Sequence, residues 1–388
     1  MISKNEMFRY YIYGYLNLRV MNNNGGTSLK EHRCLTLKNY LSLERFPKWM
    51  GTLIVWISIH AELPITLLIE LAKFMFYEVK KNYQWQLKIH DRKLYLGIRE
   101  QRLKQILGNA HIKPEDMTIV TIPLMNSRIF DGFLTIPLLS CVSAIQICKA
   151  FVYSIQMSLF MEKKYGKTDV LFRSYSSFDF FLACFCFGRL DNSNEVIYTS
   201  TYSRWGYLFA NLSVRTTFLQ HGMLGNNLSF LKKTGCPDVA FFLNEEEKEN
   251  CCKQLFTKVP ESHFLDGLKF TSNEKLLNNG RLNVLIVCNL IHFEKEEVIA
   301  RALHRSGKYN IYMKPHPLDS CFKYRELENE IPIIILLKTE YPKVNVVISY
   351  QSTLAIEYRD AGVHVIWHDE KNAEEVLGEI YKLQYRCN

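Results

Sequence analysis

The residues best suited to chemistry lie in one segment, Tyr309–Pro317, which reads Tyr-Asn-Ile-Tyr-Met-Lys-Pro-His-Pro. Its first five residues predict a short strand. The two prolines end that strand, because proline has no N–H to donate to a sheet ladder. A residue that precedes a proline is also held in extended geometry. We therefore expect Lys314 and His316 on a stiff loop just past the carboxyl end of a strand, where a cation and a hydrogen-bond donor can be held in place.

A second segment, Asn345–Glu357, predicts a buried strand that runs into hydroxyl residues and then into a helix. Ser352 and Thr353 fall where the helix starts, and Glu357 lies one turn further along the same face. Hydroxyls at that position commonly cap the helix. The same hydroxyls and the nearby backbone N–H groups also suit a phosphate, and the two roles do not exclude each other.

The two segments predict one shared ligand. In open α/β sheets, ligands bind beyond the carboxyl ends of the strands. A phosphate-bearing small molecule is the simplest ligand for both loops, and a nucleotide-sugar is the first candidate.

Together, Lys314-Pro-His-Pro317 and Ser349-Tyr-Gln-Ser-Thr353 resemble the paired motifs of bacterial GT-B glycosyltransferases of surface-polysaccharide assembly. The sequence is similar to the sialyltransferase, polysialyltransferase and capsule families, which share a His-Pro motif and a Ser/Ser-Thr motif. Gln220-His-Gly222 recurs in capsule and lipopolysaccharide relatives. The resemblance covers roughly residues 169–368.

The resemblance implies a GT-B fold, in which two Rossmann-like domains face each other across a cleft. It implies metal-independent sugar transfer from a nucleotide-sugar, with a CMP-sugar favoured, to a bacterial surface glycan such as capsule, O-antigen or lipooligosaccharide. No cofactor is expected. His316, Ser352 and Thr353 would bind the donor phosphate, with charge added by Lys314, and Glu357 would lie on the ribose side. The acceptor would be a glycan or a lipid-linked glycan.

The general base is where this chain departs from the sialyltransferase pattern. Those enzymes carry an Asp/Glu-Asp/Glu-Gly motif in the first domain, and the nearest matches here are Phe130-Asp131-Gly132 and Leu265-Asp266-Gly267. The second closes the first domain and is interpreted as structural, which leaves Asp131 as one candidate. His221 is the alternative, because it ends a strand beside the expected cleft and Gly222 lets a ligand approach the backbone. A structural turn histidine is the other interpretation of His221.

Two further functions stay open on the same motifs. One is a CDP-polyol phosphotransferase of the teichoic-acid type, and the other is a non-catalytic GT-B scaffold that binds carbohydrate. The sequence contains no Asp-x-Asp, which disfavours a metal-dependent GT-A enzyme. It also lacks a Walker loop, Gly-x-Gly-x-x-Gly and Gly-x-Ser-x-Gly, so a kinase, dehydrogenase or serine hydrolase is disfavoured as well.

The composition indicates which cellular compartment and which kinds of partner to expect. The 388 residues favour two domains, and 48% hydrophobic with 22% charged residues is typical of a globular protein. The net charge of +9 suits an anionic substrate or a membrane surface, and the absence of a long Lys/Arg block argues against nucleic acid. Eleven cysteines without a Cys-x-x-Cys pair are interpreted as mostly buried thiols of a cytoplasmic protein.

Two apolar stretches are long enough to raise the question of a membrane-spanning helix. Leu53–Phe76 contains too many polar residues to span a bilayer. Phe133–Met161 is interpreted as a core helix rather than a membrane-facing one, because Gln146, Lys149 and Gln156 would be costly in lipid. A peripheral contact with the inner face of the cell membrane stays open.

The elements that must position these residues alternate in type from Asp169 onward. Alternating strands and helices indicate parallel βαβ units, so we predict an acceptor-side domain, 1–270, and a nucleotide-sugar-binding domain, 271–388, with a hinge near residues 268–281. Residues 1–30 are expected to be irregular. Strands are predicted at 117–124, 169–172, 195–198, 216–219, 238–243, 284–288, 309–313, 333–337, 344–349 and 363–367, and helices at 100–107, 176–187, 205–212, 245–256, 294–306, from 353, and 374–383.

Overall fold

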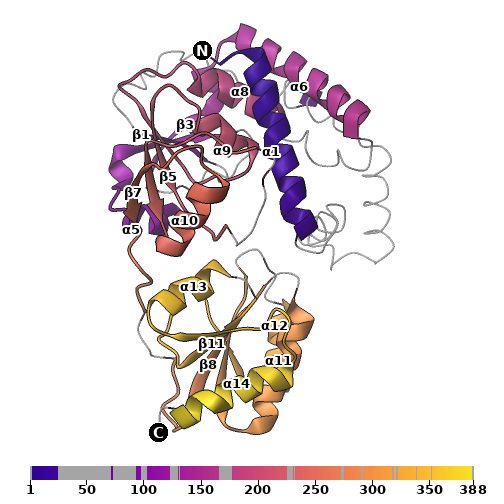
Figure 1. Ribbon diagram of the computed structural model, residues 1–388, viewed down its shortest axis with the longest axis vertical. Helices are drawn as coiled ribbons and strands as arrows, with labels where there is room; N and C mark the ends of the chain where they lie inside the picture. Colours follow the sequence, from indigo (N-terminus) through magenta and orange to yellow (C-terminus); the bar gives the residue numbers. More distant parts are fainter. Residues whose placement is uncertain are drawn as a thin grey trace. The chain divides into compact units, whose positions relative to one another are not determined.

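The protein is built from two units, Met1–Leu265 and Asp266–Asn388, each organised around one parallel sheet (Figure 1). The computed structural model describes residues 2–24, 71–72, 93–97, 103–122, 130, 132–165, 177–224, 230, 232–271, 275–289, 292–316, 319, 322–337, 339–350 and 352–386. The predicted strand at 169–172 lies outside them.

The first unit contains a seven-stranded sheet in which every neighbouring pair is parallel. Leu94, for example, lies opposite Thr118 on one side and Val196 on the other. The strands are, in spatial order, β3 (Leu134–Pro137), β2 (Met117–Thr121), β1 (Lys93–Gly97), β4 (Glu195–Tyr198), β5 (Arg215–Leu219), β6 (Val239–Phe242) and β7 (Glu261–Phe264). The order reverses between β1 and β4, which makes that gap the switch point of the sheet.

The second unit repeats this plan with five parallel strands. They are, in spatial order, β10 (Ile333–Ile335), β9 (Tyr309–Lys314), β8 (Leu282–Val287), β11 (Val346–Ser349) and β12 (His364–Trp367). Numbered within each unit, both sheets begin with the Rossmann order 3-2-1-4-5. The prediction of two Rossmann-like α/β units is therefore confirmed, and the cleft between them stays a prediction.

The helices of the first unit follow the predicted pattern from residue 177 onward. They are α1 (Lys4–Asn24), α5 (Leu103–Asn109), α6 (Ala144–Tyr165), α8 (Ser177–Phe187), α9 (Arg204–Phe209) and α10 (Glu245–Gln254), with short 3₁₀ turns at Pro114–Asp116 and Leu138–Cys141. Every residue of α8 is buried, including Ser177 and Asp179, as expected of a helix that is apolar at all its other positions. Asn244 caps α10 as predicted, because its side-chain oxygen accepts the Glu247 N–H at 2.9 Å.

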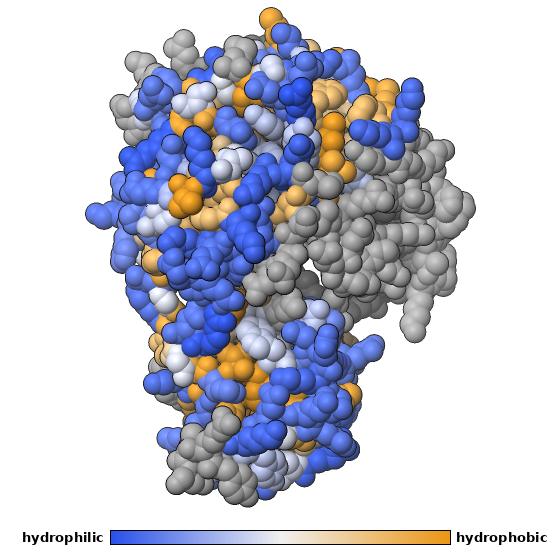
Figure 2. Space-filling model, viewed as in Figure 1, coloured by the Kyte–Doolittle hydropathy of each residue, from blue (hydrophilic) through white to orange (hydrophobic). Residues whose placement is uncertain are grey.

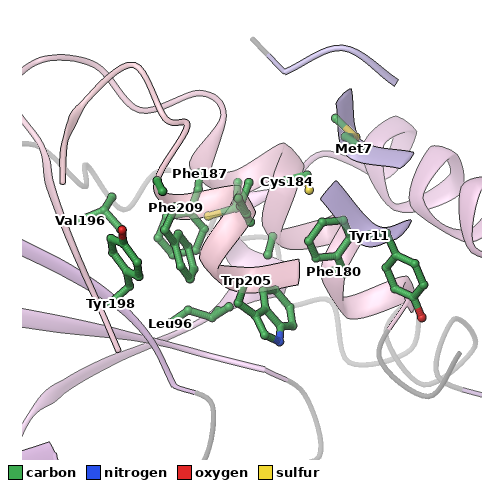
Figure 3. Packing of buried hydrophobic residues seen from close by; sticks show 14 of the residues in the cluster. Met7, Tyr11, Leu96, Phe180, Cys184, Phe187, Val196, Tyr198, Trp205 and Phe209 are labelled. Atoms are coloured by element: carbon green, nitrogen blue, oxygen red, sulfur yellow. The ribbon is translucent and has the colours of Figure 1, made fainter. Parts of the chain in front are cut away.

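The main core of the first unit is rich in aromatic side chains and is formed by the sheet and helices α1, α6, α8, α9 and α10; Figure 3 shows part of it. Phe180 on α8 lies edge-on to Trp205 on α9, with ring centroids 5.4 Å apart. Tyr11 on α1 packs edge-on against the same Phe180, at 5.5 Å. Edge-to-face pairs of this kind stabilise a core beyond the area that they bury.

The prediction that residues 1–30 are irregular is wrong for α1. Ser3 and Glu6 form a capping box: the Ser3 N–H donates to the Glu6 carboxylate at 2.8 Å, and the Glu6 N–H donates to the Ser3 hydroxyl at 3.3 Å. Met7, Tyr11 and Tyr15 then fall on one face at a spacing of four residues and are buried.

The prediction of one helix from Phe133 to Met161 is wrong in its first third. Residues 134–137 are the edge strand β3, and α6 begins only at Ala144. A second capping box starts it, since the Ser143 N–H donates to the Gln146 side chain at 2.8 Å and the Gln146 N–H donates to the Ser143 hydroxyl at 3.3 Å. The core role is confirmed for one face of α6. The helix is also long and apolar enough to cross a membrane by length and composition.

The helices of the second unit are α11 (Phe293–Ser306), α12 (Phe322–Glu330), α13 (Thr353–Asp360) and α14 (Ala373–Arg386). Gly307 ends α11 in the left-handed conformation, at φ 67°, as its position in the sequence indicates. The sequence did not predict α12, whose composition is largely polar and which buries only Tyr324 and Leu327.

The units divide after Leu265, whereas the predicted boundary lies after residue 270. Described parts of the predicted hinge are packed onto the second unit. The Phe270 ring lies 5.7 Å from the Tyr358 ring, and the Leu277 N–H donates to the Tyr312 hydroxyl at 2.9 Å. Residues 272–274 lie outside the described residues.

Two glycine substitutions are expected to change stability in opposite directions, one at the contact between α1 and α9 and the other in the open on α14. A Cβ on Gly14 would lie 2.1 Å from the Arg204 backbone nitrogen, whereas a Cβ on Gly378 in α14 would meet nothing within 4 Å. We expect Gly14→Ala to lower the free energy of unfolding by about 1–3 kcal/mol through overpacking. Gly378→Ala should raise it by about 0.5–1 kcal/mol through helix propensity. Urea unfolding measures both, and a Gly14→Ala protein as stable as the wild type would contradict the docking of α1.

Candidate active site at the carboxyl edge of the second sheet

The predicted chemical residues of the second unit follow strands that end at the same edge of the sheet. His316 follows β9, and Ser352 follows β11. The two strands are parallel and lie on either side of β8. Two strand spacings separate them, so the strand ends are about 10 Å apart. A nucleotide is long enough to reach both loops.

Lys314 is the last residue of β9 and is buried. Its ammonium donates to the carbonyl oxygens of Leu337 at 2.7 Å and Glu340 at 2.8 Å, and it lies 4.3 Å from the Tyr341 ring centroid. Lys314 therefore ties β9 to the loop that follows β10. Its contact with a donor stays a prediction.

His316 is half-buried on the loop after β9. Its carbonyl oxygen accepts the Asp319 N–H at 2.8 Å. The Asp319 carboxylate in turn accepts the Tyr324 hydroxyl at 2.9 Å and lies 2.8 Å from the Lys323 ammonium. Helix α12, which the sequence did not predict, thus anchors the loop that holds His316. The phosphate contact of His316 stays a prediction.

Ser352, Thr353 and Glu357 are half-buried at the start of α13. Ser352 occupies the N-cap position with extended backbone, at φ −116° and ψ 135°, yet its hydroxyl makes no capping hydrogen bond. The capping interpretation is therefore wrong for Ser352. The first turn of α13 also contains no acidic residue, so its N-terminus keeps the positive end of the helix dipole uncompensated by a carboxylate.

Sequence reasoning missed a buried polar group at the switch point, between the ends of β8 and β11. The Glu296 carboxylate, in the first turn of α11, is fully buried and accepts the Asn289 N–H at 2.7 Å. The His292 ring lies against the Tyr350 ring, with centroids 3.9 Å apart. Glu296 therefore holds the start of the loop after β8. The His292 and Tyr350 rings pack together just beyond the ends of β8 and β11.

The loop after β12 joins the same group. The fully buried His368 has its Nε2 3.7 Å from Glu296 Oε1, an ion-pair distance that is too long for a hydrogen bond. The His368 N–H donates to the Ser349 carbonyl at 3.0 Å. The Lys295 ammonium donates to the carbonyl oxygens of His368 at 2.5 Å and Asp369 at 2.8 Å. Three strand-end loops are thus tied to α11.

Several buried polar atoms of this group have no hydrogen-bond partner among the described residues. They are His292 Nε2, Glu296 Oε2, both ring nitrogens of His368, and Asp369 Oδ1. A buried polar atom left unpaired costs about 1–3 kcal/mol, so their concentration here indicates a ligand or ordered water. In the same described part of the chain, no three His, Cys, Asp or Glu side chains are arranged to hold a metal ion.

Burial shifts two ionisations in this group toward the neutral form. Burial raises the pKa of Glu296, although the neighbouring His368 opposes the shift. Burial also lowers the pKa of His292, and the nearby His368 and Lys295 act in the same direction. A neutral His292 imidazole can both donate and accept a hydrogen bond.

In the first unit, a buried carboxylate fixes the segment Gln220-His-Gly222 after β5. The buried Gln220 side-chain amide donates to the Glu247 carboxylate and, at 3.0 Å, to the Gly222 carbonyl. The Leu224 N–H donates to the same carboxylate at 2.9 Å. His221 is exposed between these fixed residues. An exposed imidazole on a backbone held at both sides fits a base, and its catalytic role stays a prediction.

Asp131 lies outside the described residues, so no geometry bears on its role as a base. Asp266, in the motif interpreted as structural, lies at the unit boundary with its carboxylate 3.1 Å from the Lys269 ammonium.

An open cavity of about 500 Å³ lies at the amino edge of the first sheet, where β5, β6 and β7 begin. Its lining includes Arg215, Val239 and Glu261, the first residues of β5, β6 and β7. The Asp238 carboxylate in its wall already accepts the Thr216 N–H at 2.8 Å. Within the first unit, the cavity is thus separate from the loop after β5 that carries His221.

No family model matches the chain, and no curated protein matches it. Several solved structures are similar to it. UDP-GlcNAc 2-epimerase from Neisseria meningitidis, bound to UDP-GlcNAc, is 11% identical over 72% of this chain and 82% of that chain, with a TM-score of 0.39. MurG of Acinetobacter baumannii is 10% identical over 76% and 90%, with a TM-score of 0.39. The spinosyn rhamnosyltransferase SpnG is 9% identical over 71% and 79%, with a TM-score of 0.38. At these values the likeness identifies neither an activity nor a substrate.

The environment of His292 predicts a titration below the ordinary histidine value of 6.5. NMR of the imidazole protons against pH measures it, and His292→Gln assigns the signal by its loss. Because the folded-state pKa is lowered, the stabilising contribution is present above pH 6.5 and is lost as the pH falls through the folded pKa. A midpoint at or above 6.5 would contradict the burial of the ring.

Proposed function

We propose that this protein is a glycosyltransferase that moves a sugar from a nucleotide-sugar, with a CMP-sugar favoured, to a bacterial surface glycan without a metal ion. The observation that carries the proposal is the carboxyl edge of the second sheet. Loops after the parallel strands β8, β9 and β11 bring His316, Ser352 and the N-termini of α11 and α13 to one edge of the sheet. Helix N-termini with free backbone N–H groups, together with a hydroxyl and an imidazole, suit a nucleotide phosphate.

The donor phosphate is proposed to lie between His316 and the start of α13. Ser352 supports this position because its hydroxyl makes no capping hydrogen bond with the helix. The N-terminal dipole of α13 favours an anion, and no acidic residue in its first turn repels one. Glu357, one turn along the helix, is proposed to accept hydrogen bonds from the ribose hydroxyls.

In the reaction, an acceptor hydroxyl forms a new C–O bond to the anomeric carbon of the donor sugar. The bond from that carbon to the phosphate oxygen breaks, and its electron pair leaves with the nucleotide. His316 is proposed to donate a hydrogen bond to the phosphate as its charge grows, which stabilises the transition state more than the ground state. His221 or Asp131 is proposed to take the proton of the acceptor hydroxyl.

The acceptor is proposed to be capsule, O-antigen or lipooligosaccharide, or a lipid-linked precursor of one of these, met by the first unit at the inner face of the cell membrane. The net charge of +9 supports work at an anionic surface.

A nucleotide panel tests this function. Thermal unfolding is followed in a chelator with CMP, UDP, GDP and CDP and with their sugar or polyol conjugates. A ligand at a hundred times its Kd stabilises the folded protein by about 2.7 kcal/mol. We expect CMP or another nucleotide product to raise Tm in the chelator, and less so for Ser352→Ala.

Each outcome of the panel decides between functions. Stabilisation that vanishes in the chelator would overturn the metal-free assignment. Stabilisation and turnover with CDP-polyols alone would assign the teichoic-acid type of phosphotransferase instead. Nucleotide binding without turnover of any donor would favour a carbohydrate-binding scaffold.

The role of His316 predicts a loss of rate rather than of folding. His316→Ala should lower kcat by about 10²–10³, the scale for removing one preorganised donor. The matched control is His364→Ala, which removes an exposed histidine at the opposite end of a strand in the same sheet and should leave kcat unchanged.

A second control separates catalysis from folding. Lys314→Met removes an ammonium that donates to two carbonyl oxygens and should lower Tm, whereas His316→Ala should not. A His316→Ala enzyme with wild-type kcat would remove His316 from the mechanism.

A further inference from the structure

Helix α6 presents two different faces. Ile147, Ala150, Met157 and Met161 are buried in the core of the first unit. Ile145, Val152 and Leu159 lie on the other side, where they are 68%, 47% and 50% exposed. Seven residues are close to two helical turns, so these three side chains form one row. Phe160, 39% exposed, lies beside the row.

This concentration of exposed apolar side chains is specific to α6. Among the described residues, no other helix or strand carries more than one large hydrophobic side chain with comparable exposure. Figure 2 shows hydrophobic side chains beside hydrophilic ones on the surface over α1 and α6. Single exposed hydrophobics are ordinary, but a row of them marks a contact surface.

Cations accompany the row. Lys149, Lys163 and Lys164 are exposed on the same helix, and the Lys164 ammonium lies 5.4 Å from the Phe160 ring centroid. Two neighbouring elements add cations. The exposed Arg189 guanidinium donates to the Gln146 side chain at 3.2 Å, and the exposed Lys4 ammonium on α1 lies 5.0 Å from the Tyr153 ring centroid.

Among the residues whose side chains the structure describes, α6 carries no Asp or Glu. The sequence of α6 contains one carboxylate, Glu162. On α1, the Glu6 carboxylate is engaged by the Ser3 N–H at 2.8 Å. The outer face of α6 therefore combines exposed apolar side chains with nearby lysine and arginine side chains.

We propose that the outer face of α6 binds the surface of an anionic lipid bilayer, with the helix axis parallel to the membrane. Ile145, Val152, Leu159 and Phe160 would enter the boundary between headgroups and acyl chains, as amphipathic interfacial helices do. The lysines would contact lipid phosphates, since their long stems let the ammonium stay at the polar surface. Because the cations of this face attract lipid phosphates, an anionic bilayer is favoured over a neutral one.

The same helix cannot cross the bilayer while the first unit stays folded. Its inner face packs with α8 in the aromatic core, and Ser154 and Ser158 are buried with it. Extracting the helix would expose that core to water. The mixed face therefore fits a helix that lies on a membrane rather than one that spans it.

Sedimentation with vesicles tests the proposal on the full chain, without donor or acceptor. Vesicles of equal parts phosphatidylcholine and phosphatidylglycerol are compared with phosphatidylcholine alone, at low and high salt. We expect binding to the anionic vesicles only, weakened by salt. Ile145→Gln with Leu159→Gln should reduce the partition coefficient by about tenfold or more, because interfacial binding scales with buried apolar area.

Two matched controls distinguish this face from general properties of the protein. Val259→Gln with Val298→Gln removes two valines that are 71% and 53% exposed elsewhere, and it should bind like the wild type. Lys149, Lys163 and Lys164 changed together to Gln should lose binding, whereas Lys113, Lys253 and Lys258 changed together to Gln, with the same change in net charge, should keep it. Thermal unfolding confirms that each variant is folded.

Three results would overturn the proposal. One is equal binding by the α6 variants and their controls. Another is equal binding to neutral and anionic vesicles. The third is a wild-type dimer that the α6 variant lacks, without vesicle binding, which would assign the face to a second copy of the chain.

Discussion

Parallel strand pairing is the constraint on which the rest of this structure depends. Every pairing in the described parts of both sheets is parallel. The chain must therefore return after each strand, usually through a helix, and the carboxyl ends of all strands in a sheet meet at one edge. Residues that are far apart in the sequence, such as His316 and Ser352, come to the same edge for this reason alone. The reversal of strand order between β8 and β11 then opens the place where His292 and Tyr350 lie.

Both units fix a strand-end loop with the same device. A carboxylate from the first turn of a following helix is buried and accepts a backbone N–H from the loop: Glu247 accepts from Leu224, and Glu296 accepts from Asn289. Burying a carboxylate is costly unless hydrogen bonds compensate, so these positions trade stability for a fixed loop. His221 lies exposed on the first of these loops, after β5. The second loop, after β8, leads to the buried polar group of His292, Glu296 and His368.

Sequence reasoning predicted the strands best, because buried parallel strands read as short runs such as Val346–Ser349 between turn residues. It missed α1, although the Ser3–Glu6 capping box and the four-residue spacing of Met7, Tyr11 and Tyr15 are local signals; only the packing of α1 on Phe180 is long-range. It also missed Glu296 and His368, which are distant in the chain and meet only through the pairing of β11 with β8 and β12. Lys314 was found by its motif, yet its ammonium is bound to two carbonyl oxygens, a contact that no local pattern indicates.

The carboxyl edge of the second sheet is proposed to hold the phosphate of a nucleotide. A crystal structure with a bound nucleotide product, grown in a chelator, tests it most directly. We expect phosphate density between His316 and the first turn of α13, with the remainder of the nucleotide extending along the switch point toward His292. Nucleotide density beside His221 in the first unit, with the carboxyl edge of the second sheet empty, would contradict it.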